Sequence, residues 1–152
     1  MVEIPRPQML LGTHEHTIDD KNRLTLPAKF RESFAEGLVV AKGVDRCLQA
    51  YRREDWDRLV ESRLASLDPF SQEARKIQRL LFAGAAEAEL DKQGRVMIPA
   101  PLLAHAQLRR EVVVAGLRDH VEIWDREAWG HELAEIEGSA VDVAERLAAK
   151  NE

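Results

Sequence analysis

The sequence predicts an α+β protein that is mainly β: one barrel shared by two tandem, pseudo-symmetric copies, with a helical pair between them and a C-terminal helix. Three observations favour this fold class. The 152 residues are 45% hydrophobic and 32% charged, which is typical of one globular domain. A segment at 19–30 recurs at 91–102. Each of these two segments is followed by a pattern typical of a β-hairpin and then by a helical pattern.

The duplication is seen in two aligned stretches. DDKNRLTLPAKF (19–30) matches DKQGRVMIPAPL (91–102) at an offset of 72 residues. After a one-residue insertion, GVDRCLQAYRREDW (43–56) matches GLRDHVEIWDREAW (116–129). Agreement at both ends of about 40 residues favours a tandem duplication. Because four short strands and one short helix bury too little surface to be stable alone, we expect the two copies to share one core.

Each copy begins with two short strands joined by a polar turn. The first strands span 14–18 and 87–90, and the second strands span 23–26 and 95–98. The turns contain Asn22 or Gly94, residue types that tolerate the left-handed backbone conformation of tight turns. The second strands end at Pro27 or Pro99, which cannot donate to a strand ladder but suits the first turn of a helix.

A short helix and a hairpin complete each copy. The helix spans 27–34 in the first copy, and its counterpart carries the apolar residues Leu102, Leu103 and Ala106. The hairpins pair 38–42 with 46–51 and 111–115 with 120–124. We expect each hairpin to turn at a glycine, Gly43 or Gly116.

Helical periodicity follows each hairpin. Two apolar stripes predict the helical pair: Trp56, Leu59, Val60, Leu64 and Leu67, then Phe70, Ala74, Ile77, Leu80 and Leu81. Asp68 and Pro69 are typical of an N-cap followed by proline at the first helical position, so we expect them to start the second helix. The last helix begins near Trp129 and continues past Gly138.

These elements divide the chain into five parts. They are an N-terminal extension (1–9), a first repeat (10–56), the linking helical pair (57–81), a second repeat (82–129) and an acidic C-terminal helix or tail (130–152).

The net charge of −5 argues at first against binding to nucleic acid. However, residues 125–152 hold eight acidic and three basic side chains, so they carry −5 alone, and 1–124 is neutral with 19 of each. The stretch 19–31 carries four cations and two anions. A locally basic surface is compatible with these numbers. The acidic last helix would then discourage DNA from docking on the wrong face.

Several classes of function have no support in the sequence. No apolar run is long enough to span a membrane, and the N-terminus does not resemble a secretion signal. The single cysteine, Cys47, excludes an intrachain disulfide and fits a reducing cytoplasm. The chain contains no catalytic motif and no complete metal-ligand set. We therefore expect that the protein is not an enzyme and that it uses no cofactor and no small-molecule substrate.

The strand, the D-x-x-x-R turn and the Pro-Ala helix start resemble the swapped-hairpin (AbrB-like) barrel of bacterial transcription factors. The duplicated form, with LLGTHEHTIDDKNRLTLPAKFR and then ELDKQGRVMIPAPLL, resembles the MraZ family of transcriptional regulators over roughly 10–129. The resemblance implies a double-split β-barrel and a DNA-binding repressor of a cell-division and cell-wall gene cluster, including its own gene. It also implies ring-shaped homo-oligomers that bind short, G-containing direct repeats in double-stranded DNA.

In that family the D-x-x-x-R loops contact DNA, which implies roles for residues in both copies. Arg23 and Arg95 are the candidate base readers, because an arginine can bind guanine O6 and N7 together, with about 1–3 kcal/mol of discrimination per base. Candidates for phosphate contacts are Lys21, Lys92, Lys29 and Arg31. Residues that support the loops are Asp19, Asp91, Asn22 and Gly94. Asn22 stands where glycine is usual in the family, and we expect the turn to survive.

Each of these interpretations has an alternative. The Asp–Arg pairs could be ion pairs within a turn, although their duplication disfavours this. His14 and His16 lie on one strand face and offer only two metal ligands, so an exposed polar strand is favoured. The aromatic residues that follow the hairpins favour packing over base stacking; they are Tyr51, Trp56, Trp124 and Trp129. Cys47 is typical of a small buried hydrophobe, and we assign no role to the pairs Arg52/Arg53 and Arg109/Arg110.

Three functions fit these residues, with a cytoplasmic, nucleoid-associated regulator preferred. The second is a protein-interaction scaffold in which the acidic helices act. The third is an AbrB-like antitoxin or a general chromosome-associated DNA-binding protein. Steep loss of DNA affinity with salt distinguishes the first from the second, and binding to unrelated DNA or copurification with a toxin would indicate the third.

Overall fold

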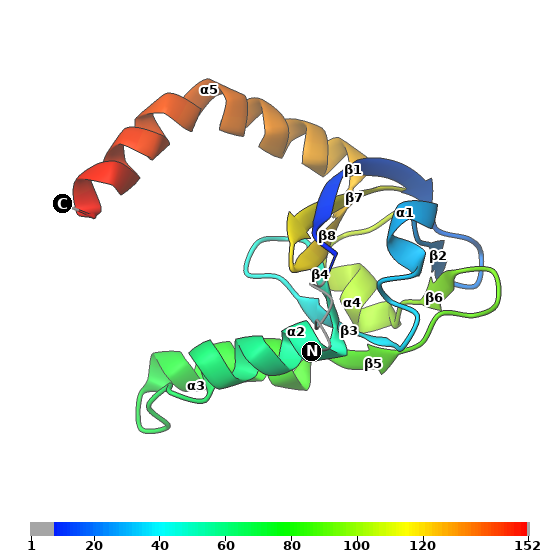
Figure 1. Ribbon diagram of the computed structural model, residues 1–152, viewed down its shortest axis with the longest axis horizontal. Coiled ribbons are helices and arrows are strands. Elements are labelled where there is room, and N and C mark those ends of the chain that lie inside the picture. Colours follow the sequence, from blue (N-terminus) through cyan, green and yellow to red (C-terminus); the bar gives the residue numbers. More distant parts are fainter. Residues whose placement is uncertain (1–7, 152) are drawn as a thin grey trace, which may run out of the picture.

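The structure is a computed structural model that describes residues 8–151, so most of the predicted extension at 1–9 lies outside the described residues. Figure 1 labels the elements. In chain order they are β1 (Leu10–Thr17), β2 (Arg23–Thr25), α1 (Ala28–Arg31), β3 (Leu38–Lys42), β4 (Leu48–Arg52), α2 (Arg53–Leu59), η1 (Val60–Leu64), α3 (Gln72–Gln78), η2 (Arg79–Ala83), β5 (Ala86–Ala88), β6 (Arg95–Met97), α4 (Ala100–His105), β7 (Glu111–Arg118), β8 (His120–Asp125) and α5 (Arg126–Lys150). The segments η1 and η2 are π-helical continuations of α2 and α3.

The two copies exchange strands. A six-stranded sheet has the order β1-β7-β8-β4-β3-β5, and β2 pairs with β6 in a separate two-stranded sheet. The hairpins β3–β4 and β7–β8 form within a copy, whereas β1–β7, β3–β5, β2–β6 and β4–β8 join one copy to the other. The predicted fold class, a mainly β, α+β barrel of the swapped-hairpin kind, is confirmed.

One hydrophobic core contains residues of both copies, as expected. Leu24 and Val96 are cross-strand neighbours in β2 and β6, and both are fully buried. The first copy adds Phe30 and Phe34, and the second adds Ile98 and other residues to the same cluster. Because each sheet contains strands of both copies, we expect neither copy to fold without the other.

Two strands are longer than the sequence indicates, because each pairs along its whole length with the other copy. β1 begins at Leu10 rather than at residue 14, since Leu10 pairs with Arg118 at the end of β7. The expected turn at Gly116 is wrong: Gly116 lies within β7 opposite Gly12. A Cβ at Gly116 would come within 2.5 Å of the Leu10 carbonyl carbon, so close strand approach explains this glycine. The hairpin turns instead at Arg118, which has a φ of 74°.

Smaller boundaries also differ. The first short helix, α1, spans Ala28–Arg31 instead of 27–34. β5 spans Ala86–Ala88 instead of 87–90, and β4 starts two residues later than 46. The expected helix start at Asp68 and Pro69 is wrong. Asp68 accepts a hydrogen bond from the Phe70 backbone N–H in a turn that precedes the helix.

The second helix of the pair is capped by Ser71, whose Oγ accepts from the Ala74 backbone N–H at 3.2 Å. Phe70, expected in the apolar stripe, is 90% exposed. The last helix, α5, starts at Arg126 because Asp125 caps it, and no residue of α5 is buried.

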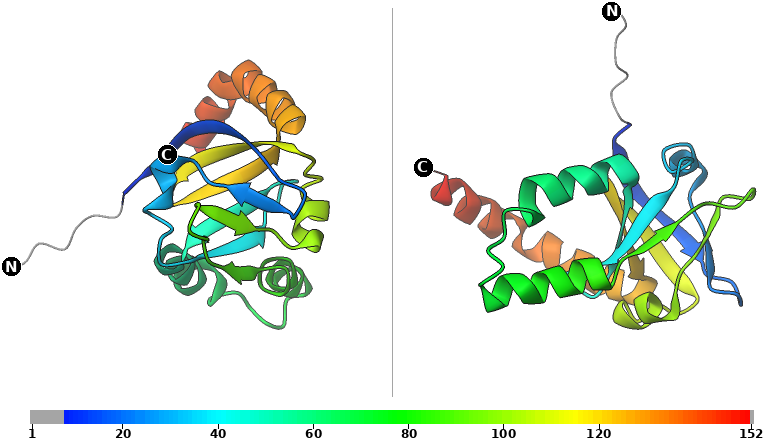
Figure 2. Two further views of the ribbon diagram at one scale, coloured as in Figure 1. Left: turned by 90° about the vertical axis from the view of Figure 1, so that its right-hand side faces the viewer. Right: turned by 90° about the horizontal axis from the view of Figure 1, so that it is seen from below.

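The linking helical pair and the last helix lie on the side of the barrel opposite to the predicted DNA loops. The helical pair (α2 to η2) and α5 extend away on one side, whereas the turns before β2 and before β6 project on the other (Figure 2). Among the described residues, no helix has the length and apolar character needed to span a membrane.

Candidate nucleic-acid interface

The two-stranded sheet brings the predicted readers together on one face. Arg23 pairs with Met97, and Thr25 pairs with Arg95. Because directly opposed residues point to the same side and side chains alternate along a strand, these four share the outer face, and Leu24 and Val96 face the core. Arg23 and Arg95 are therefore diagonal neighbours, a relationship that separates side chains by about 7–8 Å in antiparallel sheets.

Asp19 accepts hydrogen bonds from the backbone of the first turn and from the side chain of Arg23. Its Oδ1 accepts from the backbone N–H groups of Lys21 and Arg23, each at 2.9 Å. Its Oδ2 accepts from Arg23 Nε at 2.7 Å. The hydrogen bond from the Arg23 backbone N–H is the largest cause of a lowered pKa for Asp19, which keeps the carboxylate ionised.

Asp91 repeats this arrangement atom for atom. Its Oδ1 accepts from the backbone N–H groups of Gln93 and Arg95 at 2.9 Å, and its Oδ2 accepts from Arg95 Nε at 2.7 Å. Its pKa is lowered mainly by the Arg95 backbone N–H. Only Nε of each arginine is used, and within the described residues neither arginine has a hydrogen bond through its terminal nitrogens. Those nitrogens are oriented by the Nε bond and can donate to an outside acceptor.

Each turn is also bonded to the other copy. Asn22 and Gly94 have φ values of 60° and 76°, the left-handed conformation that both turns require. The Asn22 carbonyl accepts from the Ile98 N–H at 2.8 Å, and the Gly94 carbonyl accepts from the Leu26 N–H at 3.0 Å. The two loops are thereby fixed relative to each other, at opposite ends of the β2–β6 pair.

The four candidate phosphate contacts do not form two equivalent pairs. Lys21 corresponds to Gln93, and Lys92 corresponds to Asp20. Both lysines are exposed on the loops. Lys29 lies on α1, with its Nζ 3.5 Å from the Leu11 carbonyl oxygen.

Arg31 lies at the second loop. Its Nε donates to the Leu26 carbonyl at 2.9 Å, and its side chain crosses Gly94. Contact between DNA and any of these residues stays a prediction.

The two histidines of β1 lie near α1. The rings of His14 and Phe30 meet edge to face with centroids 5.2 Å apart, and His14 Nε2 is buried without a hydrogen-bond partner among the described residues. Burial, followed by the neighbouring His14 and Arg31, lowers the pKa of His16. The described residues contain no group of three or more His, Cys, Asp or Glu side chains arranged to hold a metal ion.

The aromatic residues after the hairpins pack against one another. Tyr51 contacts Trp56, and Trp124 contacts Trp129, each pair with centroids 5.7 Å apart. The predicted packing of these four residues is confirmed. Cys47 is buried, and burial raises the pKa of its thiol, which suits a small core residue.

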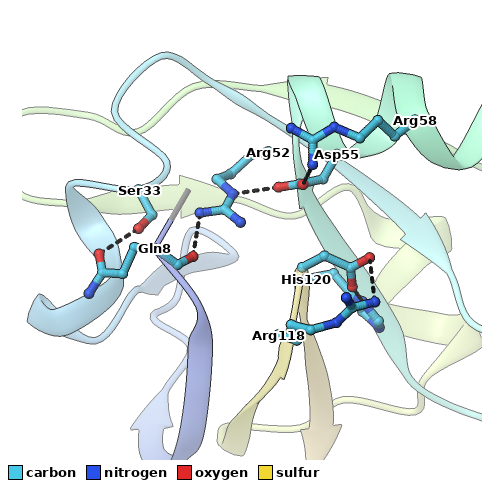
Figure 3. A network of polar contacts seen from close by, with 8 residues as sticks. Gln8, Ser33, Arg52, Asp55, Arg58, Arg118 and His120 are labelled. Atoms are coloured by element: carbon cyan, nitrogen blue, oxygen red, sulfur yellow. Dashed lines mark hydrogen bonds and ion pairs between the residues drawn. The ribbon is translucent and has the colours of Figure 1, made fainter. Parts of the chain in front are cut away.

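A buried polar network was not foreseen from the sequence. Arg52 is 6% exposed, donates through Nε to Asp55 and through Nη1 to the Gln8 carbonyl at 2.7 Å (Figure 3). Arg58 donates to the other oxygen of Asp55 at 3.1 Å. The neighbouring Arg53 is exposed, so the pair Arg52/Arg53 is split between core and surface. The spacing of Arg52, Asp55 and Arg58 by three residues is the sequence signal that could have revealed the network.

The chain is similar to known proteins along nearly its whole length. A family model described as "MraZ protein, putative antitoxin-like" matches residues 9–80 and again 81–151, in agreement with the duplication. A protein of Roseiflexus castenholzii (strain DSM 13941 / HLO8) named "Transcriptional regulator MraZ" is 45% identical over 140 residues, which cover 92% of this chain and 97% of the relative. A protein of the same name from Heliobacterium modesticaldum (strain ATCC 51547 / Ice1) is 46% identical, with 91% and 96% covered.

Proposed function

This chain belongs to the MraZ family, and we propose that it is a sequence-specific DNA-binding transcription regulator. Its relatives are named as transcriptional regulators, which are not a class of enzyme. We further propose that it acts as a repressor of a cell-division and cell-wall gene cluster, including its own promoter, in the cytoplasm at the nucleoid.

One observation carries this proposal: two arginines on the outer face of a two-stranded ribbon, each bound through Nε to an aspartate of its own loop. A two-stranded ribbon fits the major groove of B-DNA. The side chain of an arginine whose guanidinium is already held in place loses little further conformational freedom when it binds guanine O6 and N7. Arg23 and Arg95 are therefore the proposed readers, and Asp19 and Asp91 position them.

Assembly into a ring of identical subunits is part of the proposal, because one chain offers few cations to DNA. The helix α5 supports it. A stripe of apolar side chains repeats along it at alternating steps of four and three residues, the period of helix–helix packing; they are Trp129, Leu133, Ile136, Ala140, Val143 and Leu147. Leu133, Ile136, Val143 and Leu147 are at least 39% exposed in the single chain, which leaves an apolar stripe for a neighbour to cover.

Titration of DNA with the variant Arg23→Ala/Arg95→Ala tests the reading site. The probe is the duplex upstream of the chain's own gene, at two salt concentrations. The wild-type affinity should fall steeply with salt, and the variant should lose specific binding while its melting temperature and oligomer size are retained. The matched control is Arg63→Ala/Arg79→Ala, which removes two exposed arginines from the helical pair.

Two outcomes would contradict the proposal in different ways. Unchanged affinity of the Arg23→Ala/Arg95→Ala variant would show that the readers are assigned wrongly. Absence of salt-dependent binding by the wild-type chain would contradict DNA binding and favour a scaffold module. A second candidate is an antitoxin-like or general chromosome-associated protein, and the match to a family described as antitoxin-like favours the first of these. It predicts equal affinity for unrelated duplexes or copurification with a toxin.

A further inference from the structure

The two loops differ in charge although their backbones match. The first loop, 19–23, has the carboxylates Asp19 and Asp20 against Lys21 and Arg23, so it is neutral. The second loop, 91–95, has one carboxylate against Lys92 and Arg95, so it carries one positive charge. Lys92 in place of Asp20 makes the second loop more positive by two charges, and Gln93 in place of Lys21 removes one of them. The first loop therefore attracts a DNA phosphate less well by itself.

The second loop also receives an arginine from the other copy. The Arg31 side chain lies so close to Gly94 that a Cβ there would meet its Cδ at 2.5 Å. The first loop has no arginine at the symmetry-equivalent position. The residue equivalent to Arg31 is Leu103, which lines a hollow of about 220 Å³ together with Asn22.

Arg110 lies beside the first loop and lines this hollow with Asp19 and Asp20. Its carbonyl accepts from the Ile18 N–H at 2.8 Å, which ties its backbone to the start of the loop. Its side chain is exposed and makes no hydrogen bond or ion pair within the described part of the chain. The neighbouring Arg109, by contrast, is bound to Asp125 and Glu127.

This arginine is specific to the second copy. Leu38 and Val112 occupy matching positions in the two hairpins, because Leu38 pairs with Arg52 and Val112 pairs with Asp125. Two residues before them stand Glu36 and Arg110. The first copy therefore has an anion where the second has a cation.

We propose that Arg110 contacts a DNA phosphate beside the first loop, a role that rests on the proposed DNA-binding function. An exposed guanidinium without an internal partner loses no ion pair when it binds phosphate, and its planar donors match two phosphate oxygens. Its charge offsets that of Asp20. Each loop then has one arginine from the other copy, Arg31 at the second loop and Arg110 at the first, from non-equivalent positions.

The test measures affinity of the full chain for the duplex upstream of its own gene and for a scrambled duplex, over a series of salt concentrations. Arg110→Ala should weaken binding about tenfold on both duplexes, because a phosphate contact does not read sequence. The slope of log affinity against log salt should fall by about 1. Arg110→Lys keeps the charge and should keep the wild-type slope, and Arg63→Ala on the helical pair is the matched control.

The outcomes separate this assignment from the proposed function. Wild-type affinity and slope for Arg110→Ala, alongside salt-dependent binding by the wild-type chain, would overturn the role of Arg110 alone. A salt slope that falls equally in Arg110→Lys and Arg110→Ala would also overturn it, since Arg110→Lys keeps the positive charge. A wild-type chain without salt-dependent binding would overturn the DNA-binding function itself.

Discussion

The Arg31 side chain lies across Gly94 of the other copy. A Cβ at Gly94 would meet the Arg31 Cδ at 2.5 Å and Nε at 2.6 Å, and the φ of Gly94 is +76°. The matching turn in the first copy has Asn22, with a φ of 60°. The two turns have the same backbone conformation, but only the second lies under the Arg31 side chain, and that turn has glycine.

Gly94→Ala should destabilise the fold. A left-handed alanine costs about 1–2 kcal/mol, and the added methyl group must also displace Arg31. Chemical denaturation measures the free energy of unfolding. Gly138→Ala is the control, because Gly138 lies in α5 with open space around it and should gain up to about 1 kcal/mol of helix propensity. Equal stability of Gly94→Ala and wild type would contradict the close contact.

Arg52→Ala should destabilise far more than Arg53→Ala. Removing Arg52 leaves the carboxylate of Asp55, 2% exposed, with Arg58 as its remaining partner. Loss of one member of a buried ion pair costs about 3–5 kcal/mol. Arg53 forms a 3.5 Å ion pair with Glu87 between exposed side chains, which is worth at most about 1 kcal/mol. Similar denaturation midpoints for the two variants would mean that burial of Arg52 does not matter.

Asp125→Ala should destabilise the start of α5. Asp125 caps the helix by accepting from the Ala128 N–H and is bound by Arg109, with each contact at 3.2 Å. Loss of an N-cap costs about 1–2 kcal/mol. Glu127→Ala removes the other, exposed carboxylate bound to Arg109 and should change the stability little. Thermal melts followed by circular dichroism compare the two, and a larger loss in Glu127→Ala would refute the capping role.

Stability should fall in acid partly because of Asp19 and Asp91. Hydrogen bonds from the Arg23 and Arg95 backbones lower the pKa of both carboxyls in the folded chain. Because the pKa is lower folded than unfolded, this stabilisation is present above about pH 4 and is lost as the pH falls through the folded pKa. Asp19→Asn/Asp91→Asn should therefore lower the melting temperature at pH 7 and reduce its fall between about pH 5 and pH 2. Identical pH profiles would contradict this account.

Neutralising the acidic helix should increase non-specific binding to DNA. Glu132, Glu135 and Glu137 lie on α5, on the side of the barrel away from the loops (Figure 2). Their charge should repel a duplex that approaches this side. The variant Glu132→Gln/Glu135→Gln/Glu137→Gln should bind an unrelated duplex several-fold more tightly, with affinity for the promoter duplex nearly unchanged. No rise in binding to the unrelated duplex would show that the helix does not discriminate.

Local features of the site were predictable because their partners lie within a few residues. Asp19 reaches Arg23 four residues later, and the same holds for Asp91 and Arg95. The left-handed turns follow from Asn22 and glycine chemistry. By contrast, nothing local distinguishes Asp68 from Ser71 as a helix cap, because both are good capping residues, and the fold of the helical pair selected Ser71.

The sequence by itself determined the duplication, the order of strands and helices, and the shared core, because these depend on repeated motifs and apolar periodicity. Only the tertiary structure decided which strands exchange between copies, that Gly116 serves close strand approach, and that Arg52 is buried while Arg53 is exposed. Pairing of strands within a copy and pairing between copies would bury the same apolar side chains. The choice between them, and with it the relative placement of the two loops, depends on hydrogen bonds between residues 46 to 108 positions apart.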